Sequence, residues 1–316
     1  MYVLTLNAAP HEGSPLLFNM KTFFNTWCDP YTLVFTVKGE ELAAVCTGHR
    51  TDADVFRYGE FTSAGHLAMK YAEYIPAEET DRLIVWLHGI GEGVVDHTDP
   101  SVTVLANKVT SFASETFQEY VKGAYVFVPQ CPTCWMDGDG TGSSSNGGRI
   151  EADAHSFYTA ALTEMIRHYQ DTHKIRKTVI AGCSNGSYMT MLLGINSLDI
   201  ADGYVPVCEA LKDKYINDDD IKTLKDLPMY FVYSKDDPAV IPEEHEIPTL
   251  ARLKKAGAEN IHASVTEHVE DTSGLYKDKD GKPVRCSGHW SWIYLFNNEC
   301  DADGLKACYF IRGCLT

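Results

Sequence analysis

An α/β protein with a mainly parallel central sheet is the fold class that the sequence predicts, from two observations. Short continuous apolar runs, such as residues 83–87 and 124–128, are typical of strands buried on both faces. These runs alternate with helical patterns, the longest of which, residues 151–170, carries apolar side chains every three or four positions. Strands that alternate with helices form a mainly parallel sheet with helices on both faces.

The first part of the chain, residues 1–61, is expected to form a small β-rich extension, and residues 62–316 the main domain. Residues 31–37 are rich in β-branched and aromatic side chains, and Lys38-Gly39-Glu40 after them is typical of a turn. Residues 41–47 then supply the returning strand of a predicted hairpin.

The main domain continues the alternation of strands and helices. Further strands are expected at residues 67–75, 178–181, 204–208, 229–233 and 261–266, and further helices at residues 188–195, 243–256 and 290–296. Residues 138–148 consist mostly of glycine and serine, so we expect a flexible loop there.

Composition and charge exclude several classes of function. The 27 Lys and Arg residues face 44 Asp and Glu residues, and the formal net charge is −17, whereas a protein that binds a phosphate backbone needs a basic surface. No apolar run approaches the ~18 residues of a transmembrane helix, and the N-terminus lacks the basic and apolar segments of a signal peptide. We therefore expect a cytoplasmic protein that binds neither nucleic acid nor membrane, with a secreted chain that has lost its signal peptide as the alternative. The oligomeric state stays open.

The ten cysteines invite a disulfide framework, but such frameworks belong to short secreted chains. In a chain of this length without a signal peptide, free buried thiols are the better interpretation, while a bridge at Cys286 stays open. Cys131 and Cys134 have CxxC spacing, but a zinc site needs a second pair of ligands, and none stands out at the usual spacing. We expect no metal and no cofactor.

The strongest chemical motif is Gly182-Cys183-Ser184-Asn185-Gly186, which fits G-x-S-x-G between a predicted strand and a predicted helix. This is the context of a nucleophile elbow, because small residues on both sides of the serine allow a sharp turn that holds its hydroxyl above the sheet. We therefore expect Ser184 to act as a nucleophile, and a turn serine without a function is the alternative.

A serine nucleophile needs a base, and the base needs an acid that orients it. Asp236 and Asp237 both follow the strand predicted at residues 229–233, and either fits the place of the acid. His268 and His289 both follow the last predicted strand. We favour His289 as the base, because the pair Gly288-His289 opens the last predicted helix.

Backbone N–H groups must stabilise the negative charge that develops in acyl transfer. The glycine-rich run from His88 to Gly93 follows a buried strand and is suited to this role. We expect the N–H groups of Ile90 and Asn185 to form this oxyanion hole. As a phosphate cradle the run fits poorly, because it lacks the Lys-Ser/Thr pair of a P-loop.

Four motifs in this order resemble the α/β-hydrolase-fold serine hydrolases, and in particular bacterial esterases and predicted peptidases related to prolyl oligopeptidases and polyhydroxybutyrate depolymerases. The motifs are Leu87-His-Gly-Ile-Gly-Glu92, Pro129-Gln-Cys-Pro132 followed by Trp135, Gly182-Cys-Ser-Asn-Gly186, and Ser287-Gly-His289. The resemblance covers residues 62–316. It implies the α/β-hydrolase fold for that part, and residues 1–61 then resemble a short version of the immunoglobulin-like domain that some such esterases carry.

The resemblance also implies residue roles. Ser184 is the expected nucleophile and His289 the base, and Asp237 is favoured as the acid because the loop after it resembles the acid loop of the family. Glu92, Gln130 and Trp135 lie in the shared motifs, and we expect them to contact substrate, with a place in the core as the alternative for Trp135. The chain departs from the family at Asn185, at Ser187 and in the Gly/Ser loop, so a substrate is not carried over.

These residues predict a serine carboxylesterase that hydrolyses small-molecule or polymeric esters through an acyl-enzyme on Ser184. A serine peptidase of the prolyl-oligopeptidase type is the first alternative. A hydrolase fold that binds a ligand without catalysis is the second.

Overall fold

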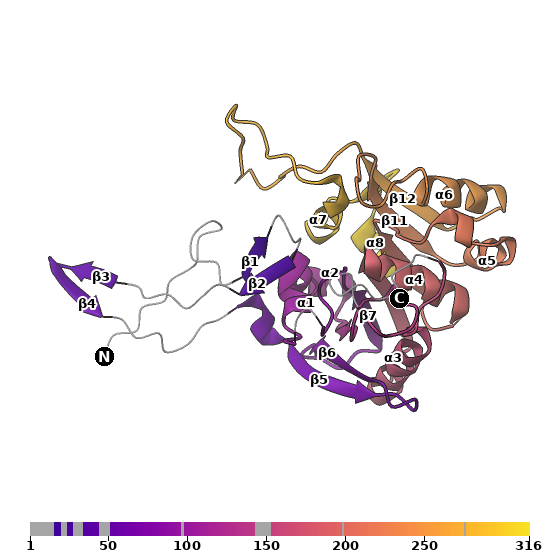
Figure 1. The fold of residues 1–316 in the computed structure, drawn as a ribbon, viewed down its shortest axis with the longest axis horizontal. Helices are drawn as coiled ribbons and strands as arrows, with labels where there is room; N and C mark the ends of the chain where they lie inside the picture. The colour runs from indigo at the N-terminus through magenta and orange to yellow at the C-terminus, as the bar shows by residue number, and fades with distance from the viewer. Residues whose placement is uncertain are drawn as a thin grey trace. The chain divides into compact units, whose positions relative to one another are not determined.

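The computed structural model describes residues 16–19, 24–27, 34–43, 51–95, 98–142, 153–197, 199–274 and 276–316 (Figure 1). The chain divides into two compact units, Met1–Asp54 and Val55–Thr316. The sequence places this division after residue 61. The structure places it earlier, because strand β5 (Arg57–Thr62) pairs along its whole length with β6 (Ala68–Tyr74) of the larger unit.

The described part of the smaller unit contains two antiparallel hairpins and, at its end, residues 51–54, which lead into the larger unit. One joins β1 (Leu16–Asn19) to β2 (Phe24–Trp27), and the other joins β3 (Val34–Val37) to β4 (Glu40–Ala43). The second hairpin confirms the predicted turn: Lys38 and Gly39 both have positive φ, at 52° and 85°, as two-residue hairpin turns require. The outer parts of the predicted strands lie outside the described residues, so the immunoglobulin-like resemblance stays a prediction.

The larger unit is built on an eight-stranded sheet in the order β12–β11–β10–β9–β7–β8–β6–β5. Neighbouring strands are parallel from β12 to β8, and β6 runs antiparallel to both of its neighbours. The remaining strands are β7 (Arg82–Leu87), β8 (Tyr125–Gln130), β9 (Lys177–Cys183), β10 (Gly203–Val207), β11 (Met229–Ser234) and β12 (Ile261–Thr266). The predicted mainly parallel sheet is confirmed.

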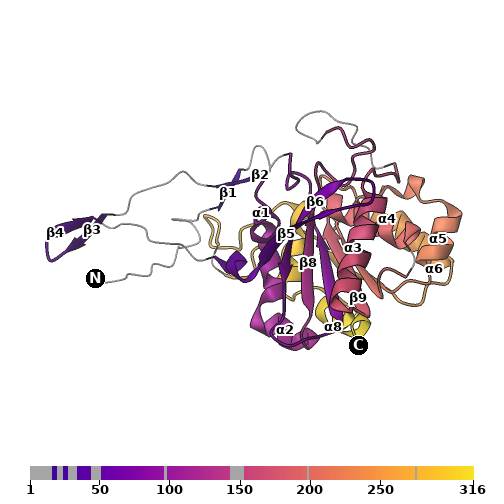
Figure 2. The same ribbon diagram turned by 90° about the horizontal axis from the view of Figure 1, so that it is seen from below.

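Helices cover both faces of this sheet (Figures 1 and 2). One face carries α3 (Thr159–His173), α4 (Asn185–Asn196), α5 (Asp218–Leu224) and α6 (Glu246–Lys255). The other carries α1 (Val102–Leu105), the 3₁₀ helix η2 (Ala106–Ala113), α2 (Glu115–Val121), α7 (Trp292–Phe296) and α8 (Ala307–Cys314). Smaller elements are η1 (Asp52–Val55), η3 (Asp213–Tyr215), η4 (Gly288–Trp290), β13 (Asp301–Ala302) and β14 (Leu305–Lys306).

The apolar runs of the sequence supply both faces of the sheet, because successive side chains of a strand point to opposite sides. In β7, Leu83 and Leu87 join the core that lies under α3 and α4. Trp86 points the other way, where its ring lies 5.8 Å from Phe112 and 4.9 Å from Phe296. A strand that packs against helices on both faces has no room for a polar side, which explains its continuous apolar run.

Three features of this unit do not follow from the sequence patterns. The predicted helix over residues 151–170 begins only at Thr159, and residues 153–158 form turns before it. The segment between β7 and β8 holds α1, η2 and α2. Within η2, Asn107 and Lys108 have positive φ (58° and 63°), so the helical turns here are too short to give a periodic apolar pattern in the sequence. The C-terminal helix α8 is also unpredicted.

The order of the strands creates one place where a site is expected. Strand β7 lies between β8 and β9, so the chain leaves β7 on one side and later returns on the other. At such a switch point the loops after neighbouring strands diverge and leave a crevice at the carboxyl edge of the sheet. The loops after β7 and β9 carry the glycine-rich run and the G-x-S-x-G motif.

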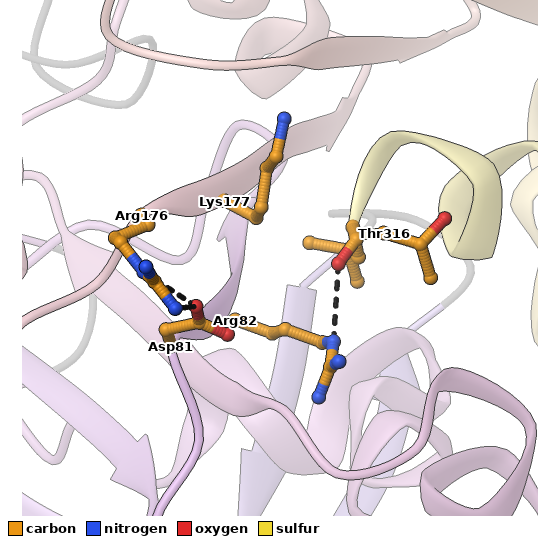
Figure 3. Close-up of a pocket in the computed structure, with 6 residues that line it drawn as sticks. Asp81, Arg82, Arg176, Lys177 and Thr316 are labelled. Carbon is orange, nitrogen blue, oxygen red and sulfur yellow. Dashed lines mark hydrogen bonds and ion pairs between the residues drawn. The ribbon is translucent and has the colours of Figure 1, made fainter.

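A cavity of about 400 Å³ lies at the opposite, amino edge of the sheet (Figure 3). Its walls include Arg82 and Lys177, the first residues of β7 and β9. Arg176 Nη2 lies 2.6 Å from Asp81 Oδ2, and Arg82 Nε donates to the Leu315 carbonyl at 3.0 Å. A strand of this length separates the cavity from the switch point by roughly 20 Å, so the two are distinct parts of the molecule. In the described parts of the chain, no helix combines the length and the apolar character needed to cross a membrane.

Candidate active site

The serine of the G-x-S-x-G motif lies on a sharp turn between β9 and α4. Ser184 has φ 53° and ψ −115°, a positive-φ conformation outside the left-handed helical region that costs energy for a residue with a side chain. A Cβ on Gly182 would lie 2.6 Å from the Gly186 carbonyl oxygen, and a Cβ on Gly186 would lie 1.9 Å from the Leu87 carbonyl oxygen. Both distances are far below van der Waals contact, so glycine is required at both positions for the turn to close.

Three side chains form one line of hydrogen bonds at the carboxyl edge of the sheet. The Ser184 Oγ lies 2.9 Å from His289 Nε2, and His289 Nδ1 lies 2.8 Å from Asp237 Oδ2. A carboxylate only accepts hydrogen bonds, so Nδ1 carries the ring proton and Nε2 is left to accept the proton of the serine hydroxyl. The structure therefore brings together the three side chains that the sequence predicts.

Asp237 and Asp236 are adjacent, but they face different partners. Asp237 is 4% exposed, and its Oδ1 accepts the backbone N–H groups of Ala239 and Val240 at 2.8 and 2.9 Å. Asp236 turns away from His289: its Oδ1 accepts from the Ser234 hydroxyl, and its Oδ2 lies 3.1 Å from Arg285 Nη2. Of the two carboxyl groups that fit the place of the acid in the sequence, Asp237 is thus the one that contacts His289.

His289 is presented by the short helix η4, which Ser287 caps by accepting the N–H of His289 at 3.3 Å. A Cβ on Gly288 would lie 2.6 Å from the Asp236 carbonyl oxygen, so the chain can pass this close to the acid loop only with glycine there. His268, the alternative base, instead pairs with Glu270, with 3.3 Å between His268 Nε2 and Glu270 Oε2.

The two backbone N–H groups predicted to form the oxyanion hole belong to Asn185, directly after Ser184, and to Ile90, on the turn after β7. The first hydrogen bond of α4 runs from Tyr188 N to Ser184 O, so the N–H of Asn185 belongs to the first turn, whose donors have no acceptor within the helix. Ile90 lies on the turn after β7 and is 36% exposed. This turn and the elbow are in contact, because Gly186 packs against the carbonyl groups of Leu87 and His88.

A buried histidine fixes the start of this turn. His88 Nε2 accepts the N–H of Cys131 at 3.0 Å, so Nδ1 carries the ring proton and donates to the Gly89 carbonyl at 2.7 Å. Burial lowers the pKa of His88 to about 4. The ring is therefore neutral at physiological pH, and its role is to join β7 to the loop after β8.

The three residues predicted to contact substrate are buried instead. Trp135 and Gln130 are fully enclosed, and Glu92 is 5% exposed. Trp135 lies in the core, where its ring packs on His88 with 5.2 Å between centroids and its backbone N–H donates to Asn185 Oδ1 at 2.7 Å. For Trp135 the alternative, a place in the core, is confirmed, whereas the enclosed side chains of Glu92 and Gln130 do not fit the prediction of substrate contact and support the loops from inside.

Cys208 also neighbours the site, although no sequence motif marks it. It directly follows β10, and its Sγ donates a hydrogen bond to the His289 carbonyl, with a length of 2.9 Å. Sγ of Cys208, a carboxyl oxygen of Asp237 and a ring nitrogen of His289 lie within 4.8 Å of one another, a spacing that would suit a metal ion. The hydrogen bond between Asp237 and His289 already accounts for their proximity. The strand order of the sheet is the signal that places Cys208 here, since β10 is the neighbour of β9.

Two more carboxyl groups are buried close to Asp237. Glu209 follows β10 and Glu246 begins α6, and both are almost fully enclosed. One oxygen of Glu209 accepts the N–H of Leu211, whereas the second oxygen and both oxygens of Glu246 have no hydrogen-bond partner among the described residues. Burial and the charge of Asp237 raise the pKa of Glu246 to about 8, and burial and the charge of Glu246 raise the pKa of Glu209. Glu246 is therefore largely protonated at neutral pH.

The cysteines of the described residues agree with the expectation of free thiols. None of them forms a disulfide, and six are buried: Cys131, Cys134, Cys183, Cys208, Cys300 and Cys308. Cys286 and Cys314 are partly exposed and also free, so no bridge fixes the histidine loop. Cys28 and Cys46 lie outside the described residues.

Comparisons with known proteins give a fold but no sequence relative. No family model matches the chain, and no curated protein matches it. Among solved structures, a thermostable esterase is similar with a TM-score of 0.66 and 21% identity, over 92% of this chain and 75% of that one. A ferulic acid esterase is similar with a TM-score of 0.54 and 12% identity, over 82% of this chain and 98% of that one. The eight-stranded, mostly parallel sheet with helices on both faces is that of the α/β-hydrolase fold, as the sequence motifs predict.

Proposed function

We propose that this protein is a serine hydrolase that cleaves carboxylic esters, with Ser184 as nucleophile, His289 as base and Asp237 as orienting acid. The observation that carries the proposal is the unbroken line of hydrogen bonds from Ser184 through His289 to Asp237. The carboxyl group of Asp237 is held in place by two backbone N–H groups, so it is oriented toward His289. A serine, an imidazole and a buried carboxyl group in this order form the arrangement that activates a hydroxyl group for acyl transfer.

The first half of the reaction forms an acyl-enzyme. As Ser184 Oγ attacks the ester carbonyl carbon, its proton passes to His289 Nε2, and the C=O electron pair moves onto the carbonyl oxygen. The imidazolium that results is stabilised by Asp237. Collapse of the tetrahedral intermediate expels the alcohol, which takes the proton from Nε2.

The second half repeats the chemistry with water. His289 Nε2 takes a proton from a water molecule, whose oxygen attacks the acyl carbon. The intermediate then collapses, the bond to Ser184 Oγ breaks, and the proton returns from Nε2 to that oxygen. A carboxylic acid leaves, and the enzyme regains its starting state.

Both tetrahedral intermediates carry a negative oxygen that needs hydrogen-bond donors. In this proposal, the N–H groups of Ile90 and Asn185 supply them. Asn185 is joined directly to the nucleophile, and Gly186 holds the turn that carries Ile90 against the elbow. The loss of one such donor typically costs ~10²–10³ in kcat.

An ester is preferred to a peptide as the substrate. The two solved structures described above are both of esterases, which supports this choice. A serine peptidase that uses the same three side chains is the second candidate, because the chemistry of acyl transfer is shared.

Two experiments test the proposal with Ser184→Ala as the blank. A fluorophosphonate probe should label the wild-type protein at Ser184, identified by mass spectrometry of the labelled peptide. A protein that stays unlabelled and turns over no substrate would point to a binding role and defeat the proposal. A series of p-nitrophenyl esters of increasing acyl length, assayed beside short peptides, should show turnover of the esters. Turnover of the peptides alone would make the protein a peptidase.

A further inference from the structure

The carboxyl group of Glu92 lies inside the protein under the turn that follows β7, and the reaction steps above do not use it. Its Oε2 accepts the N–H of Gly89 at 2.8 Å, and its Oε1 accepts from the side-chain amide of Asn107 at 3.2 Å. Both oxygens therefore have donors. These hydrogen bonds offset the cost of burying a polar group and hold the carboxyl group in one position under the turn.

The surroundings of Gly89 place this carboxyl group close to Cys183 of the elbow. A Cβ on Gly89 would lie 3.6 Å from Glu92 Oε2 and 3.7 Å from the Sγ of Cys183, the residue before Ser184. The backbone of Glu92 is held as well, because Gln130 Nε2 donates to its carbonyl at 3.0 Å. Glu92 thus connects the turn, the elbow and the end of β8.

The hydrogen bonds on either side of Gly89 determine where the N–H of Ile90 points. Gly89 gives its N–H to Glu92 and receives a hydrogen bond on its carbonyl from His88 Nδ1. The peptide between Gly89 and Ile90 is trans, so the N–H of Ile90 points opposite to that carbonyl. Holding the two polar groups of Gly89 therefore fixes the direction of the Ile90 donor.

We propose that Glu92 is a positioning residue, which holds the peptide before Gly89 while His88 holds the peptide after it, so that the Ile90 N–H faces the oxyanion. This inference rests on the proposed function. It differs from the sequence-based expectation that Glu92 contacts substrate, because Glu92 acts through the backbone and stays out of the site.

The charge of Glu92 matters for this role. Burial raises its pKa to about 8, so the carboxyl group is neutral at pH 7. The groups around it carry no charge either: Asn107 and Gln130 are amides, His88 is neutral, and burial raises the pKa of the Cys183 thiol. A neutral Glu92 adds no negative charge near the oxygen that becomes negative in the reaction. Above pH 8 it ionises and opposes that charge.

Two substitutions at Glu92 separate its hydrogen bonds from its charge. In Glu92→Ala, kcat should fall roughly 10- to 100-fold while KM changes less than about threefold, because a displaced oxyanion donor weakens transition-state binding. Glu92→Gln should keep kcat at pH 7 within about threefold of wild type, because its amide resembles the protonated acid and Asn107 can turn its amide to match.

Two further variants control for general damage to the fold. Gln118→Ala removes a buried side chain that also joins two backbone groups, the carbonyl of Phe112 and the N–H of Ala124, at a distance from the site. It should lower the melting temperature and leave kcat unchanged. Asn107→Gly removes only the second hydrogen bond of Glu92 and tolerates the φ of 58°, so it should lower kcat less than Glu92→Ala.

The pH profile gives a readout that a merely structural role would not change. In wild type, kcat should decline as the pH rises through about 8, and in Glu92→Gln this decline should be absent. A Glu92→Ala protein that matches wild type in kcat, or a decline that persists in Glu92→Gln, would overturn the proposal. A wild-type protein that neither labels nor turns over esters would instead overturn the proposed function, which the fluorophosphonate probe reports separately.

Discussion

The two edges of the parallel sheet use polar groups in opposite ways. At the carboxyl edge, polar groups are enclosed and hydrogen-bond to one another in fixed directions, and Asp237 is only 4% exposed. At the amino edge, the cavity of Figure 3 is lined by ion pairs in contact with water, where the Arg176 side chain is 81% exposed. Geometry governs the first edge because water cannot replace a lost partner, whereas solvent screens the second. We therefore expect substitutions at the carboxyl edge to have far larger effects.

The sharpest test of this difference compares two neighbouring aspartates at the carboxyl edge. Asp237→Asn should lower kcat/KM by ~10⁴, because His289 then loses the acceptor that selects its tautomer. Asp236→Asn should stay within about threefold of wild type, since the partners of Asp236 are Ser234 and Arg285. Ester hydrolysis under identical conditions measures both. Equal losses of kcat/KM in the two variants would mean that neither the burial of Asp237 nor its hydrogen bond to His289 sets it apart from Asp236.

A second comparison lies within the helix α4. Gly186→Ala places a Cβ 1.9 Å from the Leu87 carbonyl oxygen, so the elbow must move away from the turn that carries Ile90. We expect kcat to fall by ~10²–10³, as for a lost oxyanion donor. Gly194→Ala, farther along the same helix, meets side-chain atoms at 3.4 Å and should be tolerated, with up to about 1 kcal/mol gained from helix propensity. Chemical denaturation and kcat together separate the two, and a tolerated Gly186→Ala would contradict the close contact.

The pH dependence of stability tests the enclosed carboxyl groups. The pKa of Glu246 is raised to about 8 in the folded protein from about 4.5, so the folded state binds more protons than the unfolded state between these values. The free energy of unfolding contributed by Glu246 is therefore greatest below pH 4.5 and is lost as the pH rises to about 8. Relative to Glu246→Gln, the wild type should lose up to about 1.4 kcal/mol per pH unit in this window. Parallel curves for the two proteins in urea denaturation would show that Glu246 titrates normally.

The smallest effects are expected at the amino edge. Arg176→Ala removes an ion pair whose arginine is in water, so the free energy of unfolding should change by less than about 1 kcal/mol and kcat should stay the same. Adding 0.5 M salt should affect wild type and variant almost equally. A larger loss would show that this cavity contributes more to stability than its exposure implies.

The sequence predicts best those parts of the protein in which a local pattern determines the geometry. The elbow is such a part, because only glycine fits at Gly182 and Gly186 when a strand turns directly into a helix. The hairpin turn at Lys38 and Gly39 is another. The buried strands also follow from local pattern, since a strand covered on both faces has a continuous apolar run.

The parts that the sequence does not reveal depend on contacts between distant segments. Cys208 and Asn107 reach the site from elements that no motif marks, and their contacts with His289 and Glu92 depend on the order of strands and on an irregular helix. The motifs place Trp135 and Glu92 in the correct region, but they do not show that both side chains are buried, and for Trp135 they leave substrate contact and the core as alternatives. A motif shows that a residue is near the chemistry, but only the packing shows whether it faces substrate or the core.

The site can form only after segments far apart in the sequence have folded together. The hydrogen bond from Ser184 to His289 joins residues 105 positions apart, and that from Asp237 to His289 spans 52. Contacts of this sequence separation form late and slowly, because a long stretch of chain must be ordered first. Recovery of the proposed hydrolytic activity during refolding therefore requires β9, β11 and the segment after β12 to have assembled in register, whereas helix content can return earlier. Recovered activity is thus a stricter measure of the native state than the circular dichroism of the helices.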